Sequence, residues 1–124
     1  MTDLRIAATQ ATPEIHTDHA AGLLTMRGDS YPENSFELFS PLLEWVDGFL
    51  ASGDAPLTVN LHLLYLNTSS VKVMMDIFDA LEDAHANGRE VTVHWHYDQE
   101  NERVAELAEE FREDCSFPFH IIKQ

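Results

Sequence analysis

Three consecutive hydroxyl residues, Thr68, Ser69 and Ser70, separate a run of strand-forming residues that ends at Asn67 from a helix-like pattern. The first turn of a helix has free backbone N–H groups and the positive end of the helix dipole. A Ser or Thr side chain there can cap the helix, which stabilises it by about 1 kcal/mol. The same donors bind anions, so they could also hold a phosphate esterified to Thr68, close to Lys72. The residues alone leave both interpretations open.

A phosphate on Thr68 would alter the surface around it strongly. It would add a charge of about −2, and an interface built around a neutral hydroxyl would then be blocked by repulsion and desolvation. Lys72 is poorly placed for the dipole of a helix that starts near Ser70, and a phosphate would explain its presence. The hydroxyl residues are therefore either a helix cap or a switch.

The histidines are the second group that could do chemistry. His94 and His96 share one side of the alternating segment 91–97, and His62 lies in an earlier strand-like segment. Three imidazoles on one open sheet face could bind a metal, so a metal-dependent hydrolase is an alternative function. Polar residues on a solvated sheet face are the simpler interpretation, because spacing fixes no acidic or cysteine ligand beside them.

Other catalytic signatures are missing from the sequence. It contains no GxxxxGK[ST], GxGxxG, HExxH or GxSxG motif. The single cysteine, Cys115, has acidic neighbours that disfavour a thiolate, so we expect it to be structural. The glutamates of residues 100–113 are typical of a solvated helix face. We therefore expect no catalysis, no cofactor and no metal.

Composition narrows the choice of partners. The 124 residues include 22 acidic and 7 basic side chains, which gives a net charge of −15. Such a surface repels nucleic acids and anionic lipid, so we expect no nucleic-acid or direct membrane binding. No signal peptide or membrane-spanning stretch is apparent, so we expect a cytoplasmic protein. A hydrophobic content of 44% is enough for a core, and we expect a single domain over residues 1–124.

Periodicity predicts the order of the elements. We expect short strands within residues 4–27, strands at 57–66, 91–97 and 119–123, and helices within 33–51, from about 70 to 86, and after a cap at Asp98 or Asn101. Pro41 could occupy a first helical turn with Ser40 as its cap, which would split the first helix. Residues 57–97 have the length of a βαβ unit with a parallel strand pair. The fold class is α/β, a two-layer sandwich with a mixed sheet and helices mainly on one face.

The first expected helix has an unusually large apolar surface. One line of apolar side chains would account for an ordinary surface helix, but this segment has two. The first comprises Phe36, Phe39, Leu43, Val46 and Leu50, and the second Leu38, Leu42, Trp45 and Phe49. We expect a well-buried helix, and the alternative is that one line docks a partner.

Longer motifs carry a resemblance to known proteins. The turn Asn67-Thr68-Ser69-Ser70 resembles the Asp-Ser-Ser-Gly turn of STAS domains, the anti-sigma factor antagonists of the SpoIIAA type. Thr68 falls where those proteins carry their phosphorylated serine, and Ser70 replaces the glycine. The sequence is more similar to the SiaC family of regulatory phosphoproteins, in the stretches GDSYPENSFELF (28–39), LYLNTSSVKVMMDIFD (64–79) and NERVAELAEEFREDCSFPF (101–119).

The resemblance implies a STAS-like fold and a phosphorylation-switched adaptor. A SiaB-like kinase would phosphorylate Thr68, and a PP2C-type, SiaA-like phosphatase would remove the phosphate. The unphosphorylated form would bind and activate a SiaD-like GGDEF diguanylate cyclase, which raises cyclic di-GMP and promotes biofilm formation and aggregation. An anti-sigma factor antagonist in a partner-switching pathway is the alternative.

Two segments are the expected partner-binding surface. The first contains Asn67, Thr68, Ser69, Ser70 and Lys72. The second is the loop from Asp29 to Asn34, whose mixture of polar and aromatic residues exceeds what a connector needs. Its candidates are Asp29, Ser30, Tyr31, Glu33 and Asn34.

Overall fold

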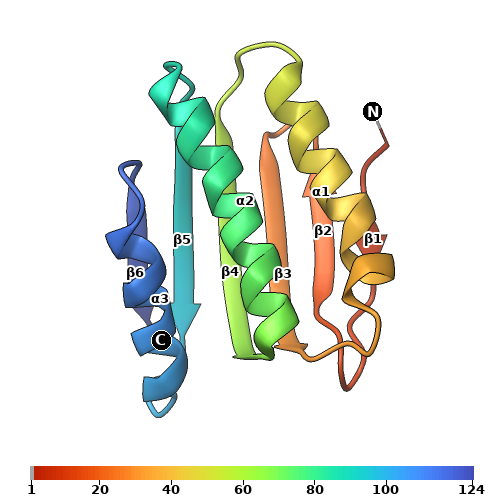
Figure 1. The fold of residues 1–124 in the computed structure, drawn as a ribbon, viewed down its shortest axis with the longest axis vertical. Coiled ribbons are helices and arrows are strands. Elements are labelled where there is room, and N and C mark those ends of the chain that lie inside the picture. Colours follow the sequence, from red (N-terminus) through yellow and green to blue (C-terminus); the bar gives the residue numbers. More distant parts are fainter. Residues whose placement is uncertain (1) are drawn as a thin grey trace.

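One mixed β-sheet organises the chain in the computed structural model, which describes residues 2–124 (Figure 1). Its strands are β1 (Arg5–Ile6), β2 (Glu14–Asp18), β3 (Leu23–Ser30), β4 (Leu57–Leu66), β5 (Val91–Tyr97) and β6 (Phe119–Lys123). The helices are α1 (Ser35–Ala51), α2 (Thr68–Ala86) and α3 (Glu102–Glu113). The predicted mixed α/β fold class is confirmed.

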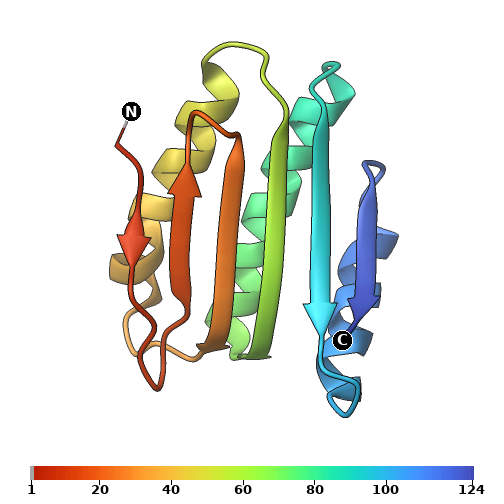
Figure 2. The same cartoon turned by 180° about the vertical axis from the view of Figure 1, so that it is seen from behind.

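Strand order in the sheet follows the chain from β1 to β6. The pairs β1–β2 and β2–β3 are antiparallel, and β3 to β6 are parallel to their neighbours. Right-handed crossovers that advance in one direction across a sheet place their helices on the same face. All three helices accordingly cover one face and leave the other uncovered (Figures 1 and 2). This arrangement confirms the expected two layers.

The core lies between the sheet and the helices. Alternate residues of β4 are buried, as a central strand requires: Leu57, Val59, Leu61 and Leu63. An aromatic cluster fills the space below α2 and α3 and comprises Phe78, Trp95, Phe111 and Phe119. The Trp95 indole N–H has no hydrogen-bond partner among the described residues, so its energetic role is packing.

Helix α1 is continuous, and the predicted split at Pro41 is wrong. Asn34 is the N-cap, because its side chain accepts a hydrogen bond from Glu37 N at 3.0 Å. Pro41 lies inside the helix, and the Ser40 hydroxyl donates to the Phe36 carbonyl at 2.6 Å instead of capping a new helix. The expected burial is confirmed for most of the apolar lines, but the Phe36 side chain is 83% exposed.

The remaining element boundaries agree closely with the sequence patterns. Helix α3 is capped by Asn101, whose side chain accepts from Val104 N at 3.3 Å, and not by Asp98. Helix α2 begins at Thr68, slightly earlier than expected. None of the described helices combines the length and the apolar character that a membrane crossing requires.

Candidate functional site

Asn67 is the N-cap of α2. Its side-chain oxygen accepts hydrogen bonds from the Ser70 backbone N–H at 2.9 Å and from the Ser69 hydroxyl at 3.1 Å. Its own backbone N–H donates to the Ser30 carbonyl at 2.9 Å, which fixes the turn to the end of β3. The interpretation that a Ser or Thr side chain caps this helix is therefore wrong, because an amide performs that function.

Two of the three hydroxyls fasten α2 to its neighbours. The Ser70 side chain is 1% exposed, its oxygen lies 2.6 Å from the Ser30 hydroxyl oxygen, and it lies 3.0 Å from the Ser30 carbonyl. Ser69 and Ser35 pair their hydroxyl oxygens at 2.5 Å, which joins the first turns of α1 and α2. Ser30, Ser69 and Ser70 thus act inside the fold, by holding three elements together.

Thr68 differs from both of its hydroxyl neighbours. It is the first residue of α2, it is exposed, and its hydroxyl makes no hydrogen bond to a described residue. An enzyme that modifies a hydroxyl needs access to the oxygen and must not break the fold to obtain it. Of Thr68, Ser69 and Ser70, only Thr68 satisfies both conditions.

The two predicted segments form one continuous area. Asp29 and Ser30 are the last residues of β3 and pair with Tyr65 and Leu66 on β4, after a register shift between Gly28 and Asp29. The Tyr31 and Tyr65 rings meet edge to face at 5.9 Å, and their side chains are 39% and 46% exposed. The segment that contains Asp29 and Tyr31 therefore lies beside the end of β4 that leads into α2.

The remaining members of the loop have different positions. Glu33 is exposed. Asn34 is also exposed, but its side chain caps α1 and contacts Glu37. Both are accessible to a partner from the same end of the molecule as Thr68, because the chain passes directly from β3 into α1 (Figure 1).

Lys72 has a partner within its own helix. Its ammonium nitrogen lies 3.4 Å from an Asp76 carboxylate oxygen, in an i,i+4 pair on the exposed face of α2. Such pairs stabilise helices modestly. This ion pair accounts for Lys72 without a phosphate, so the helix position of the lysine is not evidence for one.

A groove that no sequence pattern predicted lies beside Thr68. Its volume is about 520 Å³, and it separates α2 from α3 over the end of β4. Apolar atoms of Tyr65, Val71 and Leu107 line it together with Thr68. The charged side chains along it are Arg103, Glu106 and Glu110. The width of the groove depends on the distance between α2 and α3, and no local sequence pattern predicts that distance.

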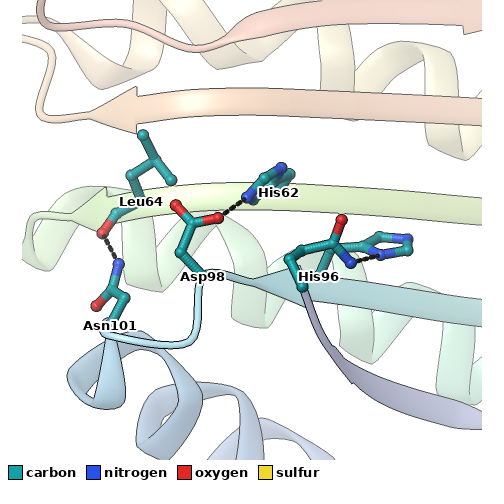
Figure 3. Close-up of polar contacts among 6 residues, drawn as sticks. His62, Leu64, His96, Asp98 and Asn101 are labelled. Atoms are coloured by element: carbon teal, nitrogen blue, oxygen red, sulfur yellow. Dashed lines mark hydrogen bonds and ion pairs between the residues drawn. The ribbon is translucent and has the colours of Figure 1, made fainter.

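Figure 3 shows how the start of α3 is held to β4. The Asn101 side chain donates a hydrogen bond to the Leu64 carbonyl of β4 at 2.9 Å, in addition to capping α3. One amide therefore positions the first turn of α3 relative to the residues that lead into α2.

The histidines do not share a centre. His62 Nε2 lies 3.0 Å from Asp98 Oδ1 (Figure 3). Gln124 Nε2 lies 3.0 Å from His96 Nδ1. His94 lies opposite Asn60 on β4 and meets the ring of His120 at 5.3 Å. Among residues 2–124, no group of three or more His, Cys, Asp or Glu side chains is arranged to hold a metal ion. The three-imidazole site left open by the sequence is not assembled.

The environment of the uncovered face affects one imidazole. Partial burial lowers the pKa of His96, and the nearby His62 and His94 lower it further. His96 is consequently biased toward its neutral form.

Cys115 behaves as its acidic neighbours predict. Burial raises the pKa of its thiol to about 11, with Glu82, Asp114 and Asp79 adding to the effect. The thiol donates to the Phe111 carbonyl at 3.2 Å. The expectation that a thiolate is disfavoured here is confirmed, because a thiol with this pKa is protonated at neutral pH.

Comparison with known proteins shows the family of this chain. Residues 6–124 match the family described as SiaC family regulatory phosphoprotein. The chain belongs to the SiaC family. The SiaC resemblance of the sequence is confirmed, whereas the likeness of its turn to STAS domains is not borne out.

Relatives with high identity extend over nearly the whole chain. An uncharacterized protein of Pseudomonas aeruginosa strain UCBPP-PA14 is 65% identical over 121 residues, which cover 98% of this chain and 96% of that protein. SiaC of P. aeruginosa, whose structure has been solved, is 62% identical in sequence to this chain. Its structure matches with a TM-score of 0.95 over 100% of both chains. A chain in the crystal structure of the diguanylate cyclase SiaD in complex with its activator SiaC, from the same organism, is 64% identical. Its TM-score is 0.96, over 98% of this chain and 100% of that one.

Proposed function

We propose that this protein is a non-catalytic cytoplasmic adaptor that binds and activates a GGDEF diguanylate cyclase, and so raises cyclic di-GMP and promotes biofilm formation. The observation that carries this proposal is the match to the complex of SiaD with its activator SiaC, at 64% identity and a TM-score of 0.96. At that similarity the backbone of the surface is preserved, and a partner of the same class can dock on it.

Reversible phosphorylation of Thr68 is the proposed control. A SiaB-like kinase transfers a phosphoryl group to the Thr68 oxygen, and a PP2C-type, SiaA-like phosphatase hydrolyses the ester. The accessibility of Thr68 and the freedom of its hydroxyl support this assignment. Ser69 and Ser70 are less suitable, because their oxygens hold α2 against α1 and β3.

Charge explains how a phosphate would block the cyclase. The chain has a net charge of −15, and Glu106 and Glu110 already line the groove beside Thr68. A phosphate adds about −2 next to the apolar atoms of Tyr65 and Val71. A partner surface built around a neutral hydroxyl offers the phosphate no charge of its own, so docking would have to remove water from a dianion, which is costly.

The proposed docking surface consists of the accessible members of the two segments. Thr68 and Lys72 contribute from α2, and Tyr31, Glu33 and Asn34 contribute from the β3–α1 connection. The other members support this surface from β3, from the cap of α2 and from its first turn, where they fix the backbone: Asp29, Ser30, Asn67, Ser69 and Ser70. The exposed side chain of Phe36 adds an apolar contact next to it.

Cyclase activation by matched variants tests the proposal. We expect Thr68→Asp to fold normally and to weaken activation of a SiaD-like cyclase by about tenfold or more, the effect of a charge that the partner does not match and that costs at least about 1.4 kcal/mol at an interface. Thr68→Ala should keep activation and resist the kinase. Site-mapping mass spectrometry of the protein from its own cells should find the phosphate on Thr68.

Lys123→Ala is the control and should leave activation unchanged, because Lys123 lies on the edge strand β6, which β5 separates from β4. The switch is refuted if the Thr68→Asp variant and the phosphorylated protein both activate the cyclase as well as the unmodified chain does.

A further inference from the structure

Arg103 is a basic residue without an assigned role, and it faces the same groove as Thr68. Thr68 is the first residue of α2, and Arg103 lies in the first turn of α3. The chain has only 7 basic residues against 22 acidic ones. Lys72 and Arg112 form ion pairs within their own helices, with Asp76 and Glu109. Arg103 forms no ion pair with any residue between 2 and 124.

Hydrogen bonds to the sheet hold the backbone at Arg103 and at Thr68 in place. Asn101 caps α3 and also donates to the Leu64 carbonyl at 2.9 Å, so the first turn of α3 is fixed to the end of β4 (Figure 3). Asn67 caps α2 and bonds to the Ser30 carbonyl on β3. The two walls of the groove therefore keep their separation while an exposed arginine side chain can move between them.

We propose that Arg103 is the internal counter-ion of a phosphate on Thr68, and that the pair bridges the groove and ties α3 to α2. This inference rests on the proposed function, because it takes Thr68 as the phosphorylated residue. The planar guanidinium offers two parallel N–H donors that match two phosphate oxygens. Lys72 offers a single compact charge and is already paired with Asp76.

The bridge gives phosphorylation a second consequence besides added charge. An Arg103–phosphate pair would cross above Tyr65, Val71 and Leu107 and would cover the apolar floor of the groove. It would also draw the guanidinium away from Glu106 and Glu110, which line the same wall. The phosphorylated and unphosphorylated proteins then differ in the shape of this groove, and a partner can distinguish them by shape as well as by charge.

A phosphorus NMR titration measures the pair directly. The full chain is prepared with phosphothreonine incorporated at position 68, so no kinase is required. The second pKa of a phosphothreonine is about 6, and a nearby guanidinium lowers it by favouring the dianion. We expect Arg103→Gln to raise this pKa by about half a unit or more. Arg103→Lys should keep part of the pKa lowering, because lysine keeps the positive charge but lacks the two parallel N–H donors.

Arg112→Gln is the matched control, because Arg112 lies on the same helix, outside the groove, and is paired with Glu109. Glu106 and Glu110 line the same groove, and Lys72 lies one helical turn after Thr68 and is paired with Asp76; all three are the same in all these proteins. The control should titrate like the unsubstituted phosphoprotein. Identical titration of the Arg103→Gln and Arg112→Gln phosphoproteins would overturn the inference.

Failure of this inference is distinguishable from failure of the proposed function. The proposed function fails when the phosphorylated chain still activates the cyclase, whatever the phosphate titration shows. The Arg103 inference fails when the titration is insensitive to Arg103, even if phosphorylation abolishes activation. Unphosphorylated Arg103→Gln should melt at the same temperature as the unsubstituted chain, since the side chain is exposed and unpaired.

Discussion

Two polar regions of this protein have opposite organisation. At the start of α2, Ser30, Ser35, Asn67, Ser69 and Ser70 form a connected network that joins β3, α1 and α2. On the uncovered sheet face, the histidines each contact one neighbour: His62 with Asp98, His96 with Gln124, and His94 with His120. The first region is a rigid network around one free hydroxyl, that of Thr68, whereas the histidines of the second share no metal-ligand position.

This difference shows what makes a candidate site. Histidine is the more reactive residue type, but no common ligand position connects these side chains. The hydroxyl network has ordinary side chains, but it holds Thr68 exposed beside a groove at a helix start. The position of one accessible group on a rigid support carries more functional information than the number of reactive residues.

The largest expected effect is a loss of stability when Ser70 is replaced, compared with the same replacement at Thr68. We expect Ser70→Asp to lower the free energy of unfolding by about 3 kcal/mol or more, because it buries a charge between α2 and β3. Thr68→Asp places the same group on the surface and should change stability by no more than about 0.5 kcal/mol. Urea unfolding of both variants measures the difference. Equal stability of the two variants would mean that the network does not enclose Ser70.

A smaller effect should come from the cap itself. Asn67→Ala removes the acceptor for both the Ser70 N–H and the Ser69 hydroxyl, and we expect it to cost about 1 to 2 kcal/mol in unfolding free energy. Asn34→Ala removes an exposed cap from α1 and is the matched control, with an expected cost nearer 0.5 kcal/mol. Equal costs in urea unfolding would show that the Ser69 hydroxyl bond contributes nothing to stability.

The same contrast explains which parts of the molecule could be predicted from the sequence. The strand at 91–97 and the helices were predictable because alternation and helical spacing are local properties. The identity of the α2 cap was not, because Asn67, Thr68, Ser69 and Ser70 are all good capping residues. Their roles are decided by Ser30 and Ser35, which are distant in the sequence.

The groove and the position of Arg103 could not be predicted from local sequence patterns, because both depend on how α2 and α3 pack. The position of Arg103 on the same groove as Thr68 follows from the Asn101–Leu64 hydrogen bond, which joins residues far apart in the sequence. Pro41 suggested a helix start by residue type, but the burial of Phe39 and Leu42 on either side keeps α1 continuous.

Metal addition and removal should have little effect. If the histidines contact single neighbours only, neither zinc nor a chelator should shift the thermal midpoint, because a ligand that does not bind the folded state cannot stabilise it. His94→Ala should behave like the unsubstituted chain and retain cyclase activation. A zinc-dependent rise in the midpoint that is lost in His94→Ala would contradict this expectation and restore the metal-site hypothesis.

The smallest effect concerns the pH dependence of the uncovered face. Burial, together with His62 and His94, lowers the pKa of His96 in the folded state, so the unfolded chain binds a proton more readily. The stability should fall as the pH drops below the unfolded value of about 6.5, and His96 should contribute no pH dependence above it. Between pH 7.5 and pH 5, we expect the thermal midpoint of His96→Gln to fall by less than that of the unsubstituted chain. An equal loss would exclude His96 as a source of the dependence, and a larger loss would show that its imidazole gains a proton on folding.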